Sequence, residues 1–434
     1  GCSATYYKWD GAAGWTTYGG SFSALEGEHV LSFYSEDQAV DAGGFHNEET
    51  VQTETIKVDT TFPTVAVSST TPDGSYKAGS DINATLTFSE PVYSTDSITV
   101  NFDSGGSCSV PQLNGETVAT CIYTVLPTEN SLDLSVTSIS PDSGVVEDIA
   151  GNDSTLSPTS NIDDTSDIII DTTAPSAFTA GTVAVTGGSV VPGWWNSTNT
   201  GVDVYVPVAN DPSLVGGTIQ VQAEADGAFE NVGSAYTIIL GDLAGSVKIS
   251  LTDLELEAIA GFSEGDNITF TAIISDLAGN STLGTKSTDN FDVDQVLPSV
   301  DAGSDQEVKA SVLQDASASD ATSGILSYFW SSDPSVSFDD NTIEDPTISA
   351  ITDGIYTVTL TVTDNAGNVN SDTMQFAWDT TAPNLTEVTA IKDPTNNKTP
   401  SYVFNVDSVK QLAASADGTI AYAGSCGDGD LAFA

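Results

Sequence analysis

The stretch MQFAWDTTAP, residues 374–383, ends a β-rich run at an Asp and a Pro, and the same ending recurs along the chain. DTTAP also occupies residues 171–175, and the variants DTTFP and DQVLP occupy residues 59–63 and 294–298. Each copy predicts that a strand ends at the Asp and that a proline-stiffened joint leads into the next unit. We number the joints by their linker Asp: first, Asp59; second, Asp171; third, Asp294; fourth, Asp379.

The spacing between successive joints suits one β-sandwich each, of about 80 to 120 residues. We therefore expect an all-β chain, a linear array of immunoglobulin-like antiparallel β-sandwich domains. The expected whole domains are residues 64–170, 176–293 and 299–378. The C-terminal half of one further domain is expected at residues 1–58, and the N-terminal half of another at residues 384–434. We interpret the sequence as an excerpt from a longer secreted protein.

The composition excludes several classes of partner. The formal net charge is −52, with 61 acidic residues against nine Lys and no Arg. Such a chain repels nucleic acid and anionic lipid, and it lacks the guanidinium fork that grips phosphate. No stretch is long and apolar enough to insert into a membrane. A large acidic excess suits two uses: binding hard divalent cations, and keeping a surface hydrated.

A second motif, D-x-A-G-N, precedes three of the joints by about one strand. It occurs at residues 148–152, 276–280 and 364–368, with a degenerate copy, DQAVDAGG, at residues 37–44. Gly and Asn supply positive φ angles, and Asp closes an Asx-type turn. The motif therefore predicts the turn of the last hairpin in each domain.

Together, D-x-A-G-N and DTTAP resemble the tandem bacterial immunoglobulin-like domains of cell-surface adhesins and related extracellular proteins. FSEPV, residues 88–92, looks like one bacterial immunoglobulin-like subtype. DAGSDQEV, ASASDATSGILSYFW and YTVTLTVTDNAGN, within residues 301–368, are similar to polycystic-kidney-disease (PKD) domains. The resemblance implies an extracellular location at the cell surface and a role in adhesion or in a surface filament. It does not specify a ligand, because the fold serves many functions.

Strand direction predicts where carboxylates gather. In a seven-stranded sandwich, the D-x-A-G-N turn returns to the end of the domain that holds the preceding joint. Three groups are then expected: Asp59, Glu90, Asp148 and Asn152 at the first joint; Asp171, Asn210, Asp211, Asp276 and Asn280 at the second; Asp294, Asp320, Asp364 and Asn368 at the third. All-oxygen groups of this kind are what Ca²⁺ prefers, and we predict Ca²⁺ at the joints. The alternative is that the motif is turn chemistry alone.

Cys108 and Cys121 bracket an expected hairpin with an Asn-Gly turn at Asn114 and Gly115, and we predict a disulfide between them. The alternative is a pair of reduced core cysteines. The partners of Cys2 and Cys426 are not predicted.

We do not expect an enzyme, because the only two His lie within residues 1–58 and no catalytic constellation is visible. Trp194 and Trp195 could stack on sugar, although a pair with one ring in the core and one at the domain edge is more common. Three hypotheses follow: a structural stalk or filament segment, a glycan-binding module, or an accessory region of a secreted polysaccharide-degrading enzyme. The expected partners are other copies or segments of the same protein, or a surface glycan or protein bound through a tip outside this fragment.

Overall fold

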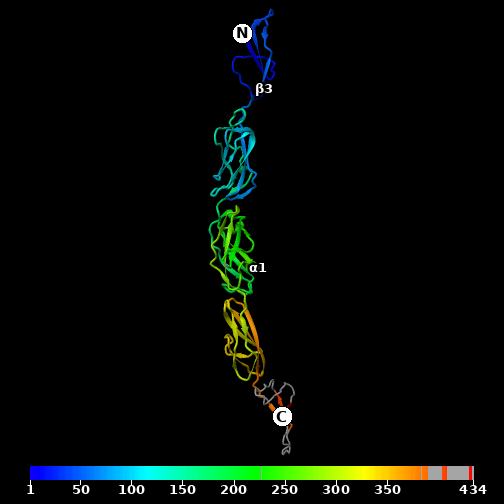
Figure 1. Ribbon diagram of the computed structural model, residues 1–434, viewed down its shortest axis with the longest axis vertical. Helices are drawn as coiled ribbons and strands as arrows, with labels where there is room; N and C mark the ends of the chain where they lie inside the picture. The colour runs from blue at the N-terminus through cyan, green and yellow to red at the C-terminus, as the bar shows by residue number, and fades with distance from the viewer. Residues whose placement is uncertain (226, 383, 390–402, 408–429, 433–434) are drawn as a thin grey trace, which may run out of the picture.

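The computed structural model describes all residues except 226, 383, 390–402, 408–429 and 433–434. The described units follow one another in a line from the N-terminus to the C-terminus, so the molecule is a long rod of beads (Figure 1). Nearly all regular structure is strand, and the α-helix of the described part is the five-residue α1 (Asp253–Glu257). No helix among the described residues could cross a membrane.

Residues 1–58, the N-terminal sheet, form a single antiparallel sheet. Its strands are β1 (Cys2–Trp9), β2 (Thr16–Thr17), β3 (Gly27–Val40), β4 (His46–Glu48) and β5 (Gln52–Val58). The order is β2-β1-β3-β4, and β5 also pairs with β3. Aromatic rings pack against one another on it: Tyr7 stacks on Phe22 and Tyr6 on Tyr34. Most side chains here stay at least partly exposed, because the described residues place no second sheet across the first.

Residues 64–170, the first sandwich, pack two antiparallel sheets around one apolar core. The strands are β6 (Val65–Ser68), β7 (Gly74–Tyr76), β8 (Asp81–Ser94), β9 (Ile98–Phe102), β10 (Ser107–Val110), β11 (Asn114–Thr124), β12 (Val136–Pro141), β13 (Val146–Glu147) and β14 (Ile168–Ile170), with a 3-10 turn at Ile162–Asp164. One sheet has the order β10-β9-β12 and the other β11-β8-β13, with β6 on β8. The alternating pattern of β8 and β9 buries every second side chain, as period-two strands should.

The predicted Asn-Gly hairpin between the two cysteines is wrong. Cys108 lies on β10 and Cys121 on β11, and these strands belong to different sheets. Buried Leu113 exchanges backbone contacts with Ser94 instead, so the chain crosses from one sheet to the other between β10 and β11. The structure contains a Cys108–Cys121 disulfide, with Cα atoms 5.8 Å apart. It therefore ties the two sheets together across the core.

Residues 176–293, the second sandwich, repeat this plan with a separate core. The strands are β15 (Val183–Thr186), β16 (Trp194–Asn196), β17 (Gly201–Pro207), β18 (Thr218–Glu224), β19 (Glu230–Asn231), β20 (Tyr236–Thr237), β21 (Ser246–Thr252), β22 (Asn267–Ser275), β23 (Ser281–Leu283) and β24 (Phe291–Asp294), with 3-10 turns at Pro212–Leu214 and Leu240–Asp242. The sheets are β15-β17-β21 and β16-β24-β22-β18-β19, with β20 on β18 and β23 on β22. Trp195 is fully buried and stacks on Phe291, whereas Trp194 is half-buried at the edge. The pair therefore serves the core, as the more common interpretation predicts.

Residues 299–378, the third sandwich, are centred on Trp330, which is buried against Phe338. The strands are β25 (Ser299–Asp301), β26 (Gln306–Val308), β27 (Val312–Leu313), β28 (Ser317–Ser319), β29 (Ile325–Asp333), β30 (Ser337–Phe338), β31 (Thr347–Ser349), β32 (Gly354–Asp364) and β33 (Val369–Trp378). They form the sheets β26-β33-β32-β29, β27-β31-β30 and β25-β28. Beyond the fourth joint, β34 (Asn384–Thr389), β35 (Val403–Asp407) and β36 (Asp430–Ala432) make one sheet. The rest of the half-domain predicted at residues 384–434, including Cys426, lies outside the described residues.

Candidate cation sites at the domain joints

The D-x-A-G-N motif folds into the same closed turn three times. The Asp N–H donates to the carbonyl of the Asn, over 3.1 Å for Asp148, 3.0 Å for Asp276 and 3.1 Å for Asp364. The Asn N–H in turn donates to a carboxylate oxygen of the same Asp, over 2.8 to 2.9 Å. The glycine between them has a φ angle near +90° in each copy, a backbone conformation that other residues rarely adopt. The motif is therefore a rigid platform whose Asn side chain has a fixed direction.

That Asn side chain holds the preceding joint. Its amide donates to the main-chain carbonyl of the linker Asp, over 3.0 Å from Asn152 to Asp59, 2.9 Å from Asn280 to Asp171 and 2.8 Å from Asn368 to Asp294. The residue two positions later also holds the linker, since the side chains of Ser154, Thr282 and Asn370 donate to the carbonyls of Pro63, Pro175 and Pro298. Each domain thus grips the linker before it at two points. The three Asn residues, predicted as cation ligands, act instead as latches.

The domain before each joint also grips the linker, which sequence reasoning missed. The residue after the linker Asp donates its N–H to a side chain of the preceding unit: Thr60 to Glu26, Thr172 to Asn130, Gln295 to Glu264 and Thr380 to Asp353, over 2.8 to 3.0 Å. We call these four acceptors the clasp residues. Three of them are an acid followed directly by Gly, shortly before the strand that leads to D-x-A-G-N. That short pattern could have identified three of the four.

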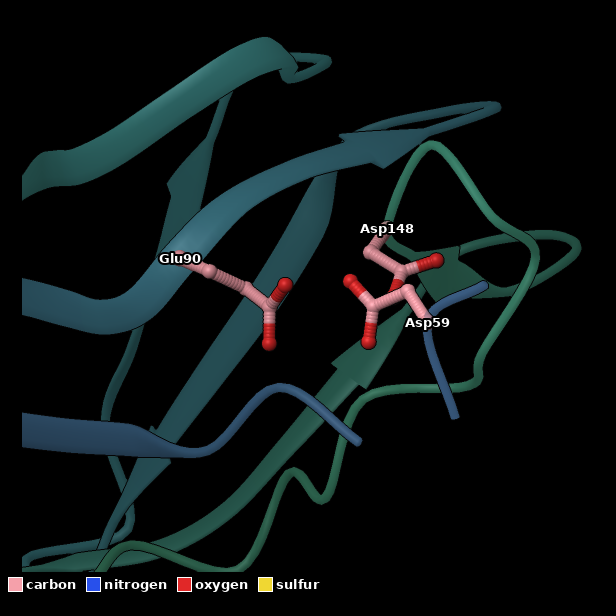
Figure 2. A group of neighbouring side chains, drawn as sticks. All are labelled: Asp59, Glu90 and Asp148. Carbon is pink, nitrogen blue, oxygen red and sulfur yellow. The ribbon is translucent and has the colours of Figure 1, made fainter. Parts of the chain in front are cut away.

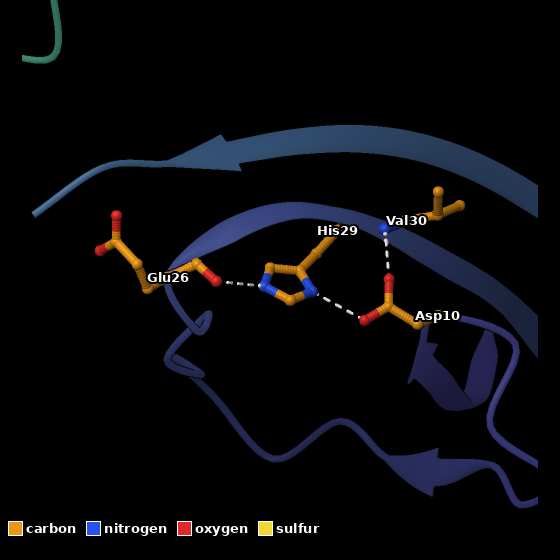
Figure 3. Close-up of polar contacts among 4 residues, drawn as sticks. All are labelled: Asp10, Glu26, His29 and Val30. Carbon is orange, nitrogen blue, oxygen red and sulfur yellow. Dashed lines mark hydrogen bonds and ion pairs between the residues drawn. The ribbon is translucent and has the colours of Figure 1, made fainter. Parts of the chain in front are cut away.

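At the N-terminal sheet, the clasp residue Glu26 is itself held by a histidine. His29 Nε2 lies 2.9 Å from the Glu26 carbonyl, and Nδ1 lies 2.7 Å from an Asp10 carboxylate oxygen (Figure 3). The other Asp10 oxygen accepts from the N–H of Val30. Both ring nitrogens therefore face acceptors, which only the doubly protonated imidazolium can satisfy. The Asp10 contact, followed by the Glu26 carbonyl, raises the pKa of His29.

The first joint brings together three carboxylates. Asp59, Glu90 and Asp148 each offer one oxygen, and these oxygens lie within 4.8 Å of one another. Figure 2 shows the three side chains converging from the linker, from β8 and from the D-x-A-G-N turn. Partial burial raises the pKa of Glu90, and the charges of Asp59 and Asp148 raise it further. Burial would also raise the pKa of Asp148, but N–H donors led by Asn152 outweigh it and lower that pKa.

The third joint gathers the same number of carboxylates in a more enclosed site. Asp294, Asp320 and Asp364 offer oxygens within 4.8 Å of one another, and Asp294 and Asp364 are 0% exposed. Both carboxylate oxygens of Asp294 are buried without a hydrogen-bond partner. Burial raises the pKa of Asp294 to about 6, and the charges of Asp320 and Asp364 act in the same direction.

The unpartnered state of Asp294 has a local cause. At the other joints, a carboxylate oxygen of the linker Asp accepts from the N–H two residues on, that of Thr61, Thr173 or Thr381. The third joint has Val296 at this place and no such bond. A buried carboxylate that lacks a hydrogen bond or a counter-charge is costly, and the four ion pairs of the described residues all lie elsewhere. A hard cation with oxygen ligands is the group that this donor set fits.

The second joint does not complete the predicted group. Burial raises the pKa of Asp171, and the charges of Asp276 and Asp211 contribute, so the carboxylates are near one another. Yet no cluster of three ligand oxygens within 4.8 Å forms at this joint among the described residues. Asp211 instead caps the 3-10 turn that follows it, accepting from the N–H and the hydroxyl of Ser213. The prediction of a shared site for Asp171, Asp211 and Asp276 is therefore not met, because Asp211 is used locally.

Comparison with known proteins identifies one of these units. A family of PKD domains matches residues 302–377. Residues 302–377 form a PKD domain. This range lies within the third sandwich, where the motifs in residues 301–368 predict a PKD domain. No curated protein matches the chain.

Several solved structures show weak likeness to the whole array. The tetra-tandem repeat in the extending region of a large adhesion protein is 16% identical, with 87% of this chain and 92% of that chain covered and a TM-score of 0.25. The fibronectin(III)-like modules of Clostridium thermocellum CbhA are 13% identical, with 45% and 94% covered and a TM-score of 0.24. The glucan-locus protein SGBP-B of Bacteroides ovatus, in complex with a heptasaccharide, is 13% identical, with 75% and 70% covered and a TM-score of 0.15. Scores this low carry no argument about function.

Proposed function

We propose that this chain is a stalk or surface-filament segment of a large extracellular repeat protein, of adhesin type, in which Ca²⁺ stiffens the joints. The observation that carries the proposal is the repeated grip on the linkers. At each of the first three joints, the linker Asp carbonyl accepts from the Asn of the next domain, and the next N–H donates to a clasp residue of the previous one. Domains joined this way keep their direction, which a spacer requires.

The calcium part of the proposal is argued from the third joint. Asp294 places two oxygens without hydrogen-bond partners in a buried site beside Asp320 and Asp364. Without a counter-charge, three carboxylates at this distance repel and push the two domains apart. A Ca²⁺ ion would take these oxygens as ligands, with water completing the six to eight that it prefers. Extracellular modules bind Ca²⁺ with dissociation constants of about 0.1 to 1 mM, which suits a protein outside the cell.

The first joint is a second candidate for the same ion. Asp59, Glu90 and Asp148 converge there, and no Lys or His forms an ion pair with them among the described residues. Its carboxylates are less buried than those of the third joint, so we expect weaker binding.

Solution scattering of the intact chain tests the stalk. With millimolar Ca²⁺ we expect a long, narrow distribution of interatomic distances, and with EDTA a shorter mean length and a broader distribution. Far-UV circular dichroism should stay nearly unchanged, because the apolar cores do not depend on the joints. Asp294→Ala should reduce the response, and Asp379→Ala, at a joint outside the three groups, is the matched control. Superimposable profiles with Ca²⁺ and EDTA would refute the calcium part, and a compact particle in Ca²⁺ would refute the stalk.

Glycan binding is the second candidate, and the N-terminal sheet favours it over Trp194 and Trp195. Tyr18 and Phe22 are 47% and 38% exposed and pack edge to face, while the Trp195 ring is buried. Exposed aromatic rings can stack on sugars. A glycan array probed with the intact chain and with Tyr18→Ala tests this function. A role as accessory region of a polysaccharide-degrading enzyme would in addition require a catalytic domain elsewhere in the same protein.

A further inference from the structure

Lys77 and Asn196 occupy equivalent positions at the second and third joints. In the first sandwich, β14 runs parallel to β7 with Ile170 opposite Tyr76, so that Lys77 comes level with the linker residue Asp171. In the second sandwich, β24 runs parallel to β16 with Asp294 opposite Asn196. Each residue thus stands beside the linker Asp, on the strand next to it.

Both side chains reach across the joint to the D-x-A-G-N turn of the next domain. Lys77 Nζ donates to the carbonyl of Gly279 over 2.9 Å, and Asn196 Nδ2 donates to the carbonyl of Ala366 over 2.7 Å. The contact is alike, but one donor carries a full positive charge and the other is neutral. The acidic second joint therefore receives an ammonium group from the protein itself, and the third joint does not.

The surroundings of the two contacts differ in the same sense. At the third joint, Asn196 is 0% exposed, and Ser197 donates its N–H and hydroxyl to the side chain of Asn368, which closes the space between the domains. At the second joint, both domains line an open groove of about 560 Å³, at which Leu132 and Leu277 are exposed. The second joint is thus tied by a long flexible side chain beside open space, and it has room to bend.

We propose that Lys77 closes the second joint in place of a metal ion, so that this joint is independent of Ca²⁺ and acts as the hinge of the array. The inference rests on the proposed function, since it assumes that the third joint binds Ca²⁺. It also explains why Asp211 is free to cap its own turn, because the second joint needs no third ligand. Lys309 holds the same register position before the fourth joint, where Val308 accepts from the Asp379 N–H as Tyr76 does from that of Asp171. The fourth joint is then of the lysine type as well.

Hydrogen exchange of the intact chain, followed by mass spectrometry, separates the joints. Peptides covering residues 171–174 and 294–297 report the two linkers while Ca²⁺ is raised from about 10 µM to about 10 mM, a range that spans extracellular calcium modules. At a Ca²⁺ concentration about ten times the dissociation constant, exchange at residues 294–297 should slow about tenfold. Exchange at residues 171–174 should not change.

Substitution of Lys77 then tests the tie itself. Lys77→Asn and Lys77→Met should speed exchange at residues 171–174 about fivefold, the effect of one lost charged hydrogen bond, and leave residues 294–297 as in the wild type. Lys77→Arg, which keeps the charge, should retain most of the protection. Equal Ca²⁺ protection at both joints, or unchanged exchange in Lys77→Asn, would overturn this inference alone. No Ca²⁺ response at either joint would overturn the calcium function and this inference with it.

Discussion

The second and third joints are built from the same motif and yet solve different electrostatic problems. Both use a D-x-A-G-N turn whose Asn donates to the linker Asp carbonyl. At the third joint, the linker carboxylate is buried without a hydrogen-bond partner beside two further acids, whereas at the second it accepts from Thr173 and lies near Lys77. The repeated motif therefore sets the geometry of a joint, and the residue beside the linker Asp sets its charge. A linear array can thus contain stiff and bending joints without any change of fold.

Separating the domains should have the largest effect, and it should be larger at the third joint. Residues 299–378 alone would expose Asp364, Ala366 and Asn368, which are buried against the second sandwich. We expect this PKD domain to unfold cooperatively but to be about 2 to 4 kcal/mol less stable than in the chain, because several buried polar contacts are lost. Chemical denaturation followed by hydrogen exchange in β32 measures the difference. Equal stability alone and in the chain would mean that the third joint adds nothing to the domain.

Removing the Asn latch should distinguish the two joints within the intact chain. Asn368→Ala leaves the buried Asp294 carbonyl and the Asp364 carboxylate without their donor, and each unsatisfied buried group costs about 1 to 3 kcal/mol. Asn280→Ala, in a more exposed turn, should cost about 1 kcal/mol. Local unfolding free energies from hydrogen exchange give both values. Asn365→Ala, in the same turn but bonded to Ser323, is the control for Asn368→Ala. Equal losses at the two joints would show that burial does not strengthen the latch.

The clasp residues should matter less, because their bonds are exposed. Glu264→Ala removes the acceptor for the Gln295 N–H at the third joint, and Asn130→Ala removes that for Thr172 at the second. Each should cost about 0.5 to 1.5 kcal/mol, as for one ordinary hydrogen bond. Exchange rates of the two linker amides measure the loss. A cost above that of Asn368→Ala would reverse the ranking and make the preceding domain the main support of the joint.

The smallest expected effect is a pH response confined to the first joint, where His29 holds the clasp residue Glu26. The pKa of His29 is raised in the folded state, so its contribution to stability is full below the ordinary value of 6.5 and is lost as pH rises through the folded value. The pKa of Asp10 is lowered, chiefly by His29, so its contribution is lost only as pH falls through that lowered value. The linker at Thr60 should therefore exchange faster at alkaline pH, after correction for the intrinsic rate, and the linker at Gln295 should not.

Imidazole resonances in NMR report the same titration directly, and His46→Gln identifies those of His29. Asp10→Asn should bring the pKa of His29 down towards 6.5, because the carboxylate is the largest cause of its shift. An unchanged titration in Asp10→Asn would show that the Asp10–His29 pair does not control the ring.

Much of this arrangement could be predicted from the sequence, because it depends on backbone rules. The joints follow from DTTAP and its variants, and strand direction alone places Asp148 beside Asp59 and Asp364 beside Asp294. The sequence analysis missed effects that depend on side-chain packing across a joint. Asp211 is followed by Pro-Ser-Leu, a helix-cap pattern that competes with ligation. Lys77 and Asn196 become equivalent only through the parallel registers of β7 with β14 and β16 with β24, which no local pattern reveals.

The cysteine hairpin shows the same limit. Asn114 and Gly115 favour a two-residue turn, yet they open β11, which pairs with β8. Tertiary pairing overrides the local preference, because burying Leu113 and Val110 places the flanking strands in different sheets.

Calorimetric titration of the intact chain with Ca²⁺, in the wild type, Asp294→Asn and Asp171→Asn, tests the central claim most directly. Asn keeps the size of the side chain and removes one charge and one strong ligand from the buried site. We predict that the tightest binding event of the wild type is lost in Asp294→Asn and retained in Asp171→Asn. Retention of that event in Asp294→Asn, or its loss in Asp171→Asn instead, would contradict the account.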